Sequence, residues 1–399
     1  MRILIDLTPL RNSLPFARLW LAGVLVSVSA QMMQMGVAWA LYNQTGSSLV
    51  VGGLGLAIGV PTVAFGLLGG ALTDTRRPRM LGIIGVSGQL GATVALLAIT
   101  FFVGFSPAPT YAAVICQSAF GAMTSPTRRP YIRHLIAPSS IPAAMSLYML
   151  SMNFGQILGP ILGGVLLSRN TVATLFAIHA LCLVMYLVSV VMLPDIPPAS
   201  HERQTIFAVG EGLRLAWRIR DIRVVLLVDI IATLFALPLA LLPALNQEIF
   251  KGDAVSYGLL LGALSSGGAL GTLFSGWIGR VRHPVKLVVL LTLVWCCGVA
   301  ALAVGSLFFV ALVALFLMGI SDAWSVITQQ IVTQTSAPDS ALGRVGSIQS
   351  IVGMAGPQLG NFRAGALGST LGTRPAIMVG STMAIILIIC FYGISVKKR

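Results

Sequence analysis

Long apolar runs, separated by short polar segments, make up almost the whole of the 399-residue chain. A helix that crosses the ~30 Å hydrocarbon core of a bilayer needs about 20 apolar residues. The pattern therefore predicts membrane-spanning helices, and the Gly and Pro residues inside several of them predict tilts or kinks. The twelve predicted spans are residues 17–42, 49–73, 79–103, 108–127, 142–168, 171–193, 224–248, 255–279, 285–305, 306–331, 342–367 and 374–395.

The longest polar stretch, residues 194–223, separates the first six runs from the last six. It starts with a Pro-rich segment, which is typical of a linker. Val209, Leu213, Ala216 and Trp217 then follow at helical spacing, with basic residues between them. This pattern predicts an amphipathic helix that lies on the membrane surface.

The two sets of six runs resemble each other at short, similarly ordered segments. GGALTDTRRP aligns with SGWIGRVRHP, IAPSSI with SAPDSA, and GPILGG with GPQLGN, at nearly equal offsets along the chain. Repeats of this kind in transporters rock against each other around a site near the middle of the membrane. The repeat predicts a six-helix bundle at 1–193, a linker at 194–223 and a second six-helix bundle at 224–399.

The composition supports a membrane protein and excludes a soluble enzyme. Hydrophobic residues make up 56% of the chain and charged residues only 9%, whereas soluble domains carry roughly 25% charged residues. A soluble protein this apolar could not cover its surface with polar groups. The bilayer is the solvent that permits such a composition.

The positive charge is distributed very unevenly among the loops. Of the 25 Lys and Arg residues, 21 fall in the loops on the side of the two termini. Because Lys and Arg accumulate in cytoplasmic loops, we expect both termini in the cytoplasm. Topology and contact with anionic lipid therefore explain the net charge of +14, and we expect no nucleic-acid partner.

No cofactor or metal site is visible in the sequence. All five cysteines lie in apolar runs, so we expect neither disulfides nor a cysteine metal site. The chain contains no GxxxxGK[ST] loop and no HExxH motif. An ATP-driven pump is therefore not expected, and an ion gradient is the predicted energy source.

Two acidic residues stand clearly inside predicted spans, Asp229 and Asp322. A carboxylate in hydrocarbon is costly, so such residues usually face a cavity and have a function. Ser325 and Gln329 fall on the helix face of Asp322, at i+3 and i+7. We interpret Asp322 and Asp229 as proton or substrate sites; Asp229 could instead pair with Arg223 or a neighbouring helix.

Other polar residues within spans are candidates to line a substrate cavity. They are Gln31 and Gln34 in the first span and Asn153 in the fifth. Arg363 in the eleventh span could hold an anionic substrate or extend to the outer surface. His179 in the sixth span is more typical of a hydrogen-bonded histidine within a helix bundle.

Small residues recur at every fourth position in two spans. Gly155, Gly159 and Gly163 form one stripe along the fifth span, which lets another helix approach closely. Pro160 removes a backbone donor and bends that helix. The eleventh span repeats the pattern, and the full set of predicted packing residues is Gly155, Gly159, Pro160, Gly163, Gly164, Gly356 and Pro357. The stripes serve packing, and they would also make sliding surfaces.

Two of these motifs resemble the major facilitator superfamily of transporters. The stretch GGALTDTRRPR resembles its signature loop between the second and third spans, although Thr75 replaces a basic residue and Arg77 a glycine. The stretch GQILGPILGG resembles the antiporter motif that exporters carry in the fifth span. Residues 125–147 and 334–348 resemble the branch of enterobactin exporters and macrolide efflux pumps.

The resemblance implies a fold and a gate. The fold is an all-α membrane protein of twelve transmembrane helices in two pseudo-symmetric six-helix bundles. Asp74 would clasp the two halves when the cytoplasmic side is closed, with Arg128 or Arg129 and the start of the eleventh span as partners. In the second repeat Arg280 stands at the matching position, so the clasp would be asymmetric. Asp74 could instead only offset the neighbouring arginines; the remaining gating candidates are Arg76, Arg77 and Arg344.

The implied function is export of a small molecule, coupled to protons, across the bacterial inner membrane. A siderophore is the first expected substrate and a macrolide-like or other drug the alternative. A receptor or scaffold on the same fold is a rival, but two costly buried acids would serve no purpose there. The antiporter motif disfavours an importer. We expect the small-molecule substrate, protons and membrane lipid as partners, and a monomer.

Overall fold

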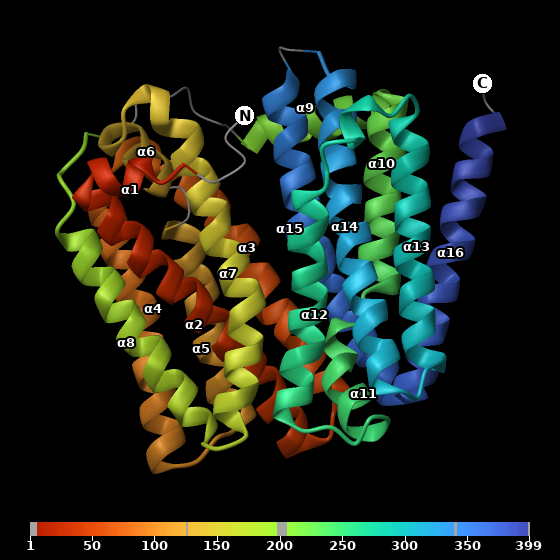
Figure 1. The fold of residues 1–399 in the computed structure, drawn as a ribbon, viewed down its shortest axis with the longest axis horizontal. Helices are drawn as coiled ribbons and strands as arrows, with labels where there is room; N and C mark the ends of the chain where they lie inside the picture. Colours follow the sequence, from red (N-terminus) through yellow and green to blue (C-terminus); the bar gives the residue numbers. More distant parts are fainter. Residues whose placement is uncertain (1–5, 125–126, 198–205, 339–340, 398–399) are drawn as a thin grey trace. The chain divides into compact units, whose positions relative to one another are not determined.

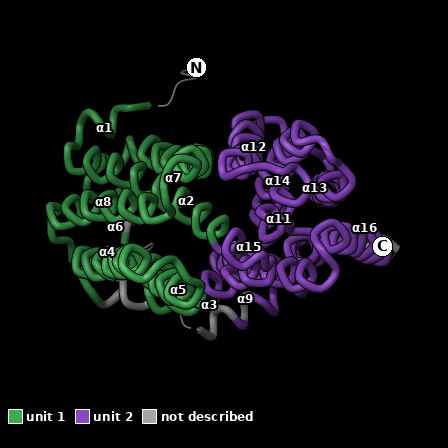
Figure 2. Tube along the Cα trace, turned by 90° about the horizontal axis from the view of Figure 1, so that it is seen from below, with its two compact units in different colours: residues 1–40, 60–203 green, residues 41–59, 204–399 purple. Residues whose placement is uncertain are grey.

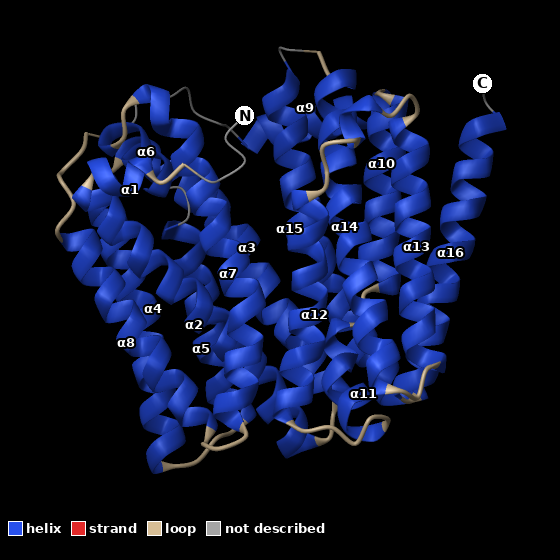
Figure 3. Ribbon diagram, viewed as in Figure 1, coloured by secondary structure: helices blue, strands red, loops and turns tan. Residues whose placement is uncertain are grey.

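The computed structural model describes residues 6–124, 127–197, 206–338 and 341–397, and every regular element within them is a helix (Figures 1 and 3). The elements follow the predicted apolar runs closely. In chain order they are α1 Thr8–Asn12, α2 Leu14–Thr45, α3 Ser48–Thr75, α4 Pro78–Phe102, α5 Pro107–Thr124, α6 Arg128–Leu135, η2 Pro138–Ser140, α7 Ile141–Leu167, α8 Val172–Val191, α9 Ile206–Arg218, α10 Arg220–Ile231, η3 Ala232–Ala236, η4 Leu239–Leu241, α11 Leu242–Glu248, α12 Ala254–Leu273, η5 Ile278–Arg280, α13 Pro284–Val304, α14 Phe308–Ser336, α15 Leu342–Leu371 and α16 Thr373–Lys397.

Ten helical segments among the described residues are long and apolar enough to cross a membrane. They cover ten of the twelve predicted spans. The other two predicted spans correspond to α5, which has only 18 residues, and to α15, which is rich in glycine and polar residues. The structure is therefore that of a multi-pass helical membrane protein.

Local signals explain where several helices begin and end. Proline stands at the start of α4 and α13, where its missing N–H and fixed φ suit the first helical turn. The side chain of Asp253 caps α12 by accepting a hydrogen bond from the Ser256 N–H at 3.0 Å. Gly372, with φ +85°, follows the last residue of α15 and allows the sharp turn into α16.

The helices form two compact units, coloured separately in Figure 2. Unit 1 contains residues 1–40 and 60–203, and unit 2 contains residues 41–59 and 204–399. The end of α2 and the first part of α3 therefore pack with the helices of the second half of the sequence. The predicted division into bundles at 1–193 and 224–399 remains a prediction.

Unit 1 is held together by apolar clusters and by the close contact between α2 and α7. α4 packs mainly on α5 and α8. The glycine stripe of α7 lies against α2, where a methyl group added at Gly159 would be 2.6 Å from the Cβ of Gln31. The indole N–H of Trp20 in α2 also donates to the carbonyl of Leu147 in α7, at 2.8 Å. Small residues thus permit the close helix approach that their spacing predicts.

Unit 2 centres on α14, which packs on α12 and α13. Gly319 of α14 and Gly268 of α12 meet so closely that a methyl group at Gly319 would lie 2.7 Å from the Gly268 nitrogen. The Ser321 hydroxyl donates to the carbonyl of Leu291 in α13 at 2.7 Å. α14 is consequently fixed on two sides, and its remaining face carries Asp322.

The predicted span 224–248 is one of the ten apolar segments, but it is not one continuous helix. Its prolines predicted a kink, and the structure shows what kind of break they make. The α-helix α10 ends at Ile231 and continues as the π-helix η3, followed by an extended Leu237 and the short helices η4 and α11. Pro238 and Pro243 cannot donate backbone hydrogen bonds, so a regular α-helix cannot run through this part. Single π turns within helices are frequent at functional sites.

The surface helix predicted after the linker is α9. Of its predicted apolar positions, Ala216 is buried in a cluster with Ile222 and Val345, whereas Leu213 and Trp217 are exposed. Ala216, with Leu215 beside it, therefore faces the rest of unit 2, and the side chain of Val209 lies outside the described residues. The exposed leucine and tryptophan suit the interface of a membrane.

Candidate functional site

The two acidic residues within spans both belong to unit 2. Asp229 lies in the last turn of α10, and its Oδ1 accepts a hydrogen bond from Gln329 Nε2 of α14 at 3.2 Å. The same Gln329 nitrogen lies 3.4 Å from the Ser325 hydroxyl, which is 3.5 Å from the Thr292 hydroxyl of α13. A chain of polar groups therefore links three helices at this point.

Asp322 lies on the same helix as Gln329 and differs from its neighbours in exposure. Ser321, Ser325 and Gln329 are buried, whereas Asp322 is exposed. Asp322 and Asp229 are also close enough to interact electrostatically. The arrangement combines one carboxyl group on an exposed residue with a second one that is held by an amide.

The alternative pairing of Asp229 with Arg223 is not what the structure contains. The Arg223 guanidinium donates instead to the carbonyl of Trp217 in α9, at 3.1 Å. Arg223 thus ties α9 to the start of α10 and leaves Asp229 to Gln329.

Arg363 of α15 has an unusual environment in unit 2. Its guanidinium carbon lies 5.8 Å from the centre of the Phe235 ring in η3, and its nitrogens lie beside Gly380 of α16. Nε and Nη1 are buried and have no hydrogen-bond partner among the described residues. Gly380 is the eighth residue of α16, so the guanidinium group lies about 10 Å along that helix from its start. It does not extend to the helix end.

The candidate polar residues of unit 1 lie on α2 and α7. Gln31 is half-buried beside the glycine stripe of α7, and Gln34 is exposed. Asn153 is half-buried on α7. His179 is buried and lies 2.9 Å from the Ser29 hydroxyl, as expected for a hydrogen-bonded histidine in a helix bundle.

A further polar contact in unit 1 was not predicted from the sequence. Gln117 Nε2 of α5 donates to the Thr93 hydroxyl of α4 at 2.7 Å and lies 3.6 Å from the sulfur of Met33. A glutamine within an apolar run was the available signal, the same one that singled out Gln31.

The signature loop between α3 and α4 is anchored within unit 1. Arg77 forms an ion pair with Asp195, which follows α8, and Arg79 donates to the carbonyl of Val191 at the end of α8. Asp195 was not among the predicted residues because its position, 118 residues from Arg77, carries no local pattern. Arg76 is exposed.

The other predicted gating residues give less structural information. Arg280 in η5 is exposed and Arg344 in α15 is half-buried. The side chains of Asp74, Arg128 and Arg129 lie outside the described residues. The predicted clasp on Asp74 therefore stays a prediction.

Residues of α2 and α3 pack on the second half of the sequence within unit 2, at the end of the helices opposite α9. The Tyr42 hydroxyl donates to Glu248 at 2.7 Å, and Gln247 Nε2 lies 3.4 Å from the side-chain oxygen of Asn43. Along α3, Gly52 meets Gly365 of α15, and a methyl group added at Gly365 would lie 2.8 Å from the Cα of Gly52. None of these contacts was predicted.

The glycines of α15 make two further close contacts. Gly356 and Gly360 lie against Thr233 of η3, and Gly368 lies against Leu241 and Ser48. Pro160 and Pro357 lie inside α7 and α15, and Gly164 is buried in α7. The glycine positions of both motifs are therefore places where helices approach closely.

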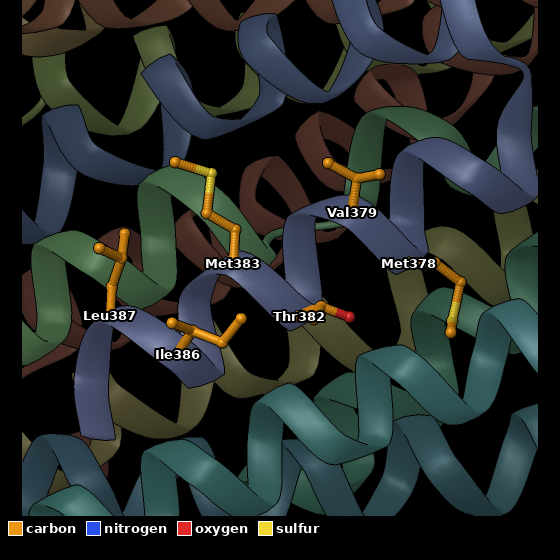
Figure 4. Close-up of a pocket in the computed structure, with 6 residues that line it drawn as sticks. All are labelled: Met378, Val379, Thr382, Met383, Ile386 and Leu387. Carbon is orange, nitrogen blue, oxygen red and sulfur yellow. The ribbon is translucent and has the colours of Figure 1, made fainter. Parts of the chain in front are cut away.

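An open, apolar pocket lies on α16. Figure 4 shows its lining, in which the Thr382 hydroxyl is the one polar group. The lining residues are Met378, Val379, Thr382, Met383, Ile386 and Leu387. None of the predicted site residues belongs to this pocket, and its apolar lining suits contact with lipid.

Residues 5–399 match the protein family described as transmembrane secretion effector, MFS_3. The chain is similar to the enterobactin exporter EntS of Shigella boydii serotype 18, with 25% identity over 358 residues that cover 88% of this chain and 82% of the relative. It is also similar to the solved structure of the nucleoside transporter NupG, with a TM-score of 0.75, 12% identity, and coverage of 95% of this chain and 98% of the other.

A second solved structure shares the fold at a comparable level. It is a bacterial homologue of the iron transporter ferroportin in an inward-facing state, with a TM-score of 0.74 and 17% identity over 96% of this chain and 98% of the other. At such identities the two solved structures establish a likeness of fold alone.

Proposed function

The chain belongs to the transmembrane secretion effector family, whose members are membrane transporters of the major facilitator type, and from this premise we propose that it exports a small molecule in exchange for protons. It is a multi-pass protein of the bacterial inner membrane. The single observation that carries the proton coupling is the acid pair of unit 2, Asp322 and Asp229, with Gln329 bound to one of its members.

The pair suits proton exchange because its two carboxyl groups differ in access. Asp322 is exposed and can take up or release a proton. Any change of charge there acts on Asp229, which Gln329 holds at 3.2 Å. Gln329, Ser325 and Thr292 carry that change across α14 and α13. A membrane protein without transport activity would have no use for this arrangement.

The full topology has twelve spans, with α5 and α15 as the two that composition alone does not mark. α15 has 30 residues, about 45 Å of helix, which is more than enough to cross the bilayer. Because 21 of 25 Lys and Arg residues fall in the loops on one side, we place both termini in the cytoplasm.

A siderophore is the first substrate to test, because relatives that match 88% of the chain are named as enterobactin exporters. Efflux of an amphipathic drug is the second candidate, because residues 125–147 and 334–348 resemble the branch that includes macrolide efflux pumps as well as enterobactin exporters. The signature loop, with Asp74 at its centre, would gate the cytoplasmic side, and the glycine stripes would provide sliding surfaces.

Transport into inside-out proteoliposomes with an acidic lumen tests the proposal. Enterobactin and ethidium serve as the two probes, and the wild-type protein should accumulate one of them only when the pH gradient is present. Asp322→Asn should lower the initial rate at least tenfold and remove its dependence on pH. Asp221→Asn, which alters an exposed acid at the start of α10, is the matched control and should transport normally.

The outcomes separate the candidates. A wild-type rate and pH dependence in Asp322→Asn would mean that the acid pair does not couple protons. If neither probe moves under any gradient, the receptor or scaffold alternative is favoured instead.

A further inference from the structure

Arg363 is a cation deep in unit 2 without a counter-ion among the described residues. Nε and Nη1 of its guanidinium are buried and lack hydrogen-bond partners. Among the described residues, the ion pair found is that of Arg77 with Asp195, in the other unit. Removing a charge from water costs several kcal/mol unless a partner offsets the loss. An arginine in this condition is therefore suited to a ligand that supplies the missing negative charge.

The surroundings of Arg363 position its guanidinium group. On one side lies the Phe235 ring, at 5.8 Å from the guanidinium carbon, a distance at which a cation interacts favourably with an aromatic face. On another side lies Gly380, where an added methyl group would be 2.9 Å and 3.0 Å from the two terminal nitrogens. The side chain is therefore held between η3 and α16, with its Nε and Nη1 donors unpaired among the described residues.

A second, independent observation points to the same place. Phe235 belongs to the π-helix η3, which interrupts the seventh span directly after Asp229. A π-helix is a costly departure from regular geometry, and short π segments are frequent at functional sites. Here the segment presents the Phe235 ring to Arg363, and its Thr233 hydroxyl donates to the carbonyl of Asp229 at 2.8 Å. The η3 segment thus contacts both Asp229, one member of the acid pair, and Arg363.

We propose that Arg363, with Phe235 beside it, binds the carboxylate group of an organic anion. The planar guanidinium offers paired N–H donors that match the two oxygens of a carboxylate. The inference deepens the proposed export function and rests on it, since it names the class of substrate: an amphipathic molecule that carries a carboxylate. Arg363 as a whole is only half-buried, so a ligand can approach the side chain, and a small shift of the guanidinium group would bring the buried Nε and Nη1 to the carboxylate.

Binding of two matched probes to the purified full-length protein tests this site. Benzoate carries the carboxylate, and benzamide has the same shape without the charge. Thermal shift titrations at constant ionic strength give an apparent dissociation constant for each. We expect benzoate to stabilise the wild-type protein and benzamide to have no effect. In Arg363→Gln the benzoate affinity should fall at least tenfold.

Two further variants keep the result interpretable. Arg374→Gln removes another arginine of unit 2, whose guanidinium donates to the Gly305 carbonyl at 3.3 Å, and should leave benzoate binding unchanged. Arg363→Lys keeps the charge without the paired donors; it should fold even where Arg363→Gln does not, and should bind benzoate more weakly than the wild type. Equal binding of benzoate and benzamide, unchanged binding in Arg363→Gln, or no benzoate binding to the wild type would each overturn the proposal.

Failure of this site and failure of the export function give different results. Binding is measured without a gradient, so Arg363-dependent benzoate binding in a protein that transports none of enterobactin, ethidium and a carboxylate probe such as benzoate would refute export and retain the site. Proton-driven transport without benzoate binding would retain export and refute the site.

Discussion

The close contact between α3 and α15 depends on two glycines, so the effect of enlarging one of them can be predicted quantitatively. A methyl group added at Gly365 would lie 2.8 Å from the Cα and 3.1 Å from the nitrogen of Gly52. Carbon atoms at optimal separation are about 3.5–4.0 Å apart, so Gly365→Ala must move the two helices apart. The neighbours are backbone atoms, which cannot rotate out of the way.

Overpacking of this kind typically costs about 1–3 kcal/mol. Because each 1.4 kcal/mol is about a tenfold change in an equilibrium, the packed arrangement should lose roughly 5- to 150-fold in population. A Gly→Ala change in a helix also gains about 1 kcal/mol in helix propensity. Gly353→Ala is the matched control for that gain, because Gly353 lies on the same helix and an added methyl group there meets nothing within 4 Å.

Thiol labelling from outside the cell measures the opening of this contact. Ser48→Cys, in a background with the five native cysteines replaced, supplies the reporter; Ser48 is only 5% exposed and lies beside Gly368. A membrane-impermeant maleimide should label position 48 about 5- to 150-fold faster in Gly365→Ala than in Gly353→Ala, because the overpacking raises the population in which the α3–α15 contact is open by that factor. Labelling rates within twofold of each other would refute the reasoning.

Three further predictions concern single contacts. Tyr42→Phe removes the 2.7 Å hydrogen bond to Glu248 and should lower the free energy of unfolding by about 0.5–1.5 kcal/mol; a double-mutant cycle with Glu248→Gln should be clearly non-additive. Arg77→Gln and Asp195→Asn should each change stability by less than about 1 kcal/mol, because the ion pair is exposed and such pairs contribute little; a larger loss in a denaturation curve would contradict this. Tyr131→Phe should raise stability by about 1–3 kcal/mol, since the Tyr131 hydroxyl is buried without a partner among the described residues. Burial raises the pKa of Tyr131 to about 12 from its ordinary value of 10.0. As the pH rises, the unfolded protein therefore loses the Tyr131 proton before the folded protein does. The wild type should lose stability through this group above pH 10, whereas Tyr131→Phe should not. A comparison of the Tm values of both proteins at pH 8 and pH 11 would check this.

The apolar runs predicted the helices well because each is a local property of the chain. The predicted span 142–168 is α7, Ile141–Leu167, and the predicted boundary at 305 falls between α13 and α14. Prolines inside the seventh span predicted a kink but not a π-helix, because hydropathy within a continuous apolar run gives no sign of a change in helix type. Proline marks the place, but the π-helix before it depends on packing against α15.

The residues of the candidate site were predictable only one at a time. Asp229, Asp322 and Gln329 stood out because polar groups are rare in hydrocarbon. Their mutual arrangement was not predictable, since the hydrogen bond from Gln329 to Asp229 joins positions 100 residues apart. The same applies to Tyr42 and Glu248, which are separated by 206 positions and have no shared local pattern.

The helix α15 contacts both the η3 segment beside Asp229 and the α3 helix. It is not among the ten segments apolar enough to mark a span, yet several of its small residues lie at close contacts with other helices. Gly360 lies against Thr233, which bonds to the carbonyl of Asp229; Arg363 lies against Phe235; and Gly365 lies against Gly52.

A rigid helix cannot shift at one of these contacts without shifting at the others. Gly365→Ala should therefore alter the pH dependence of transport as well as the labelling of position 48, even though Gly365 touches neither carboxyl group. The matched variant Gly353→Ala should leave the pH dependence unchanged. A pH profile of Gly365→Ala that coincides with that of Gly353→Ala would show that the outer contact and the acid pair respond independently.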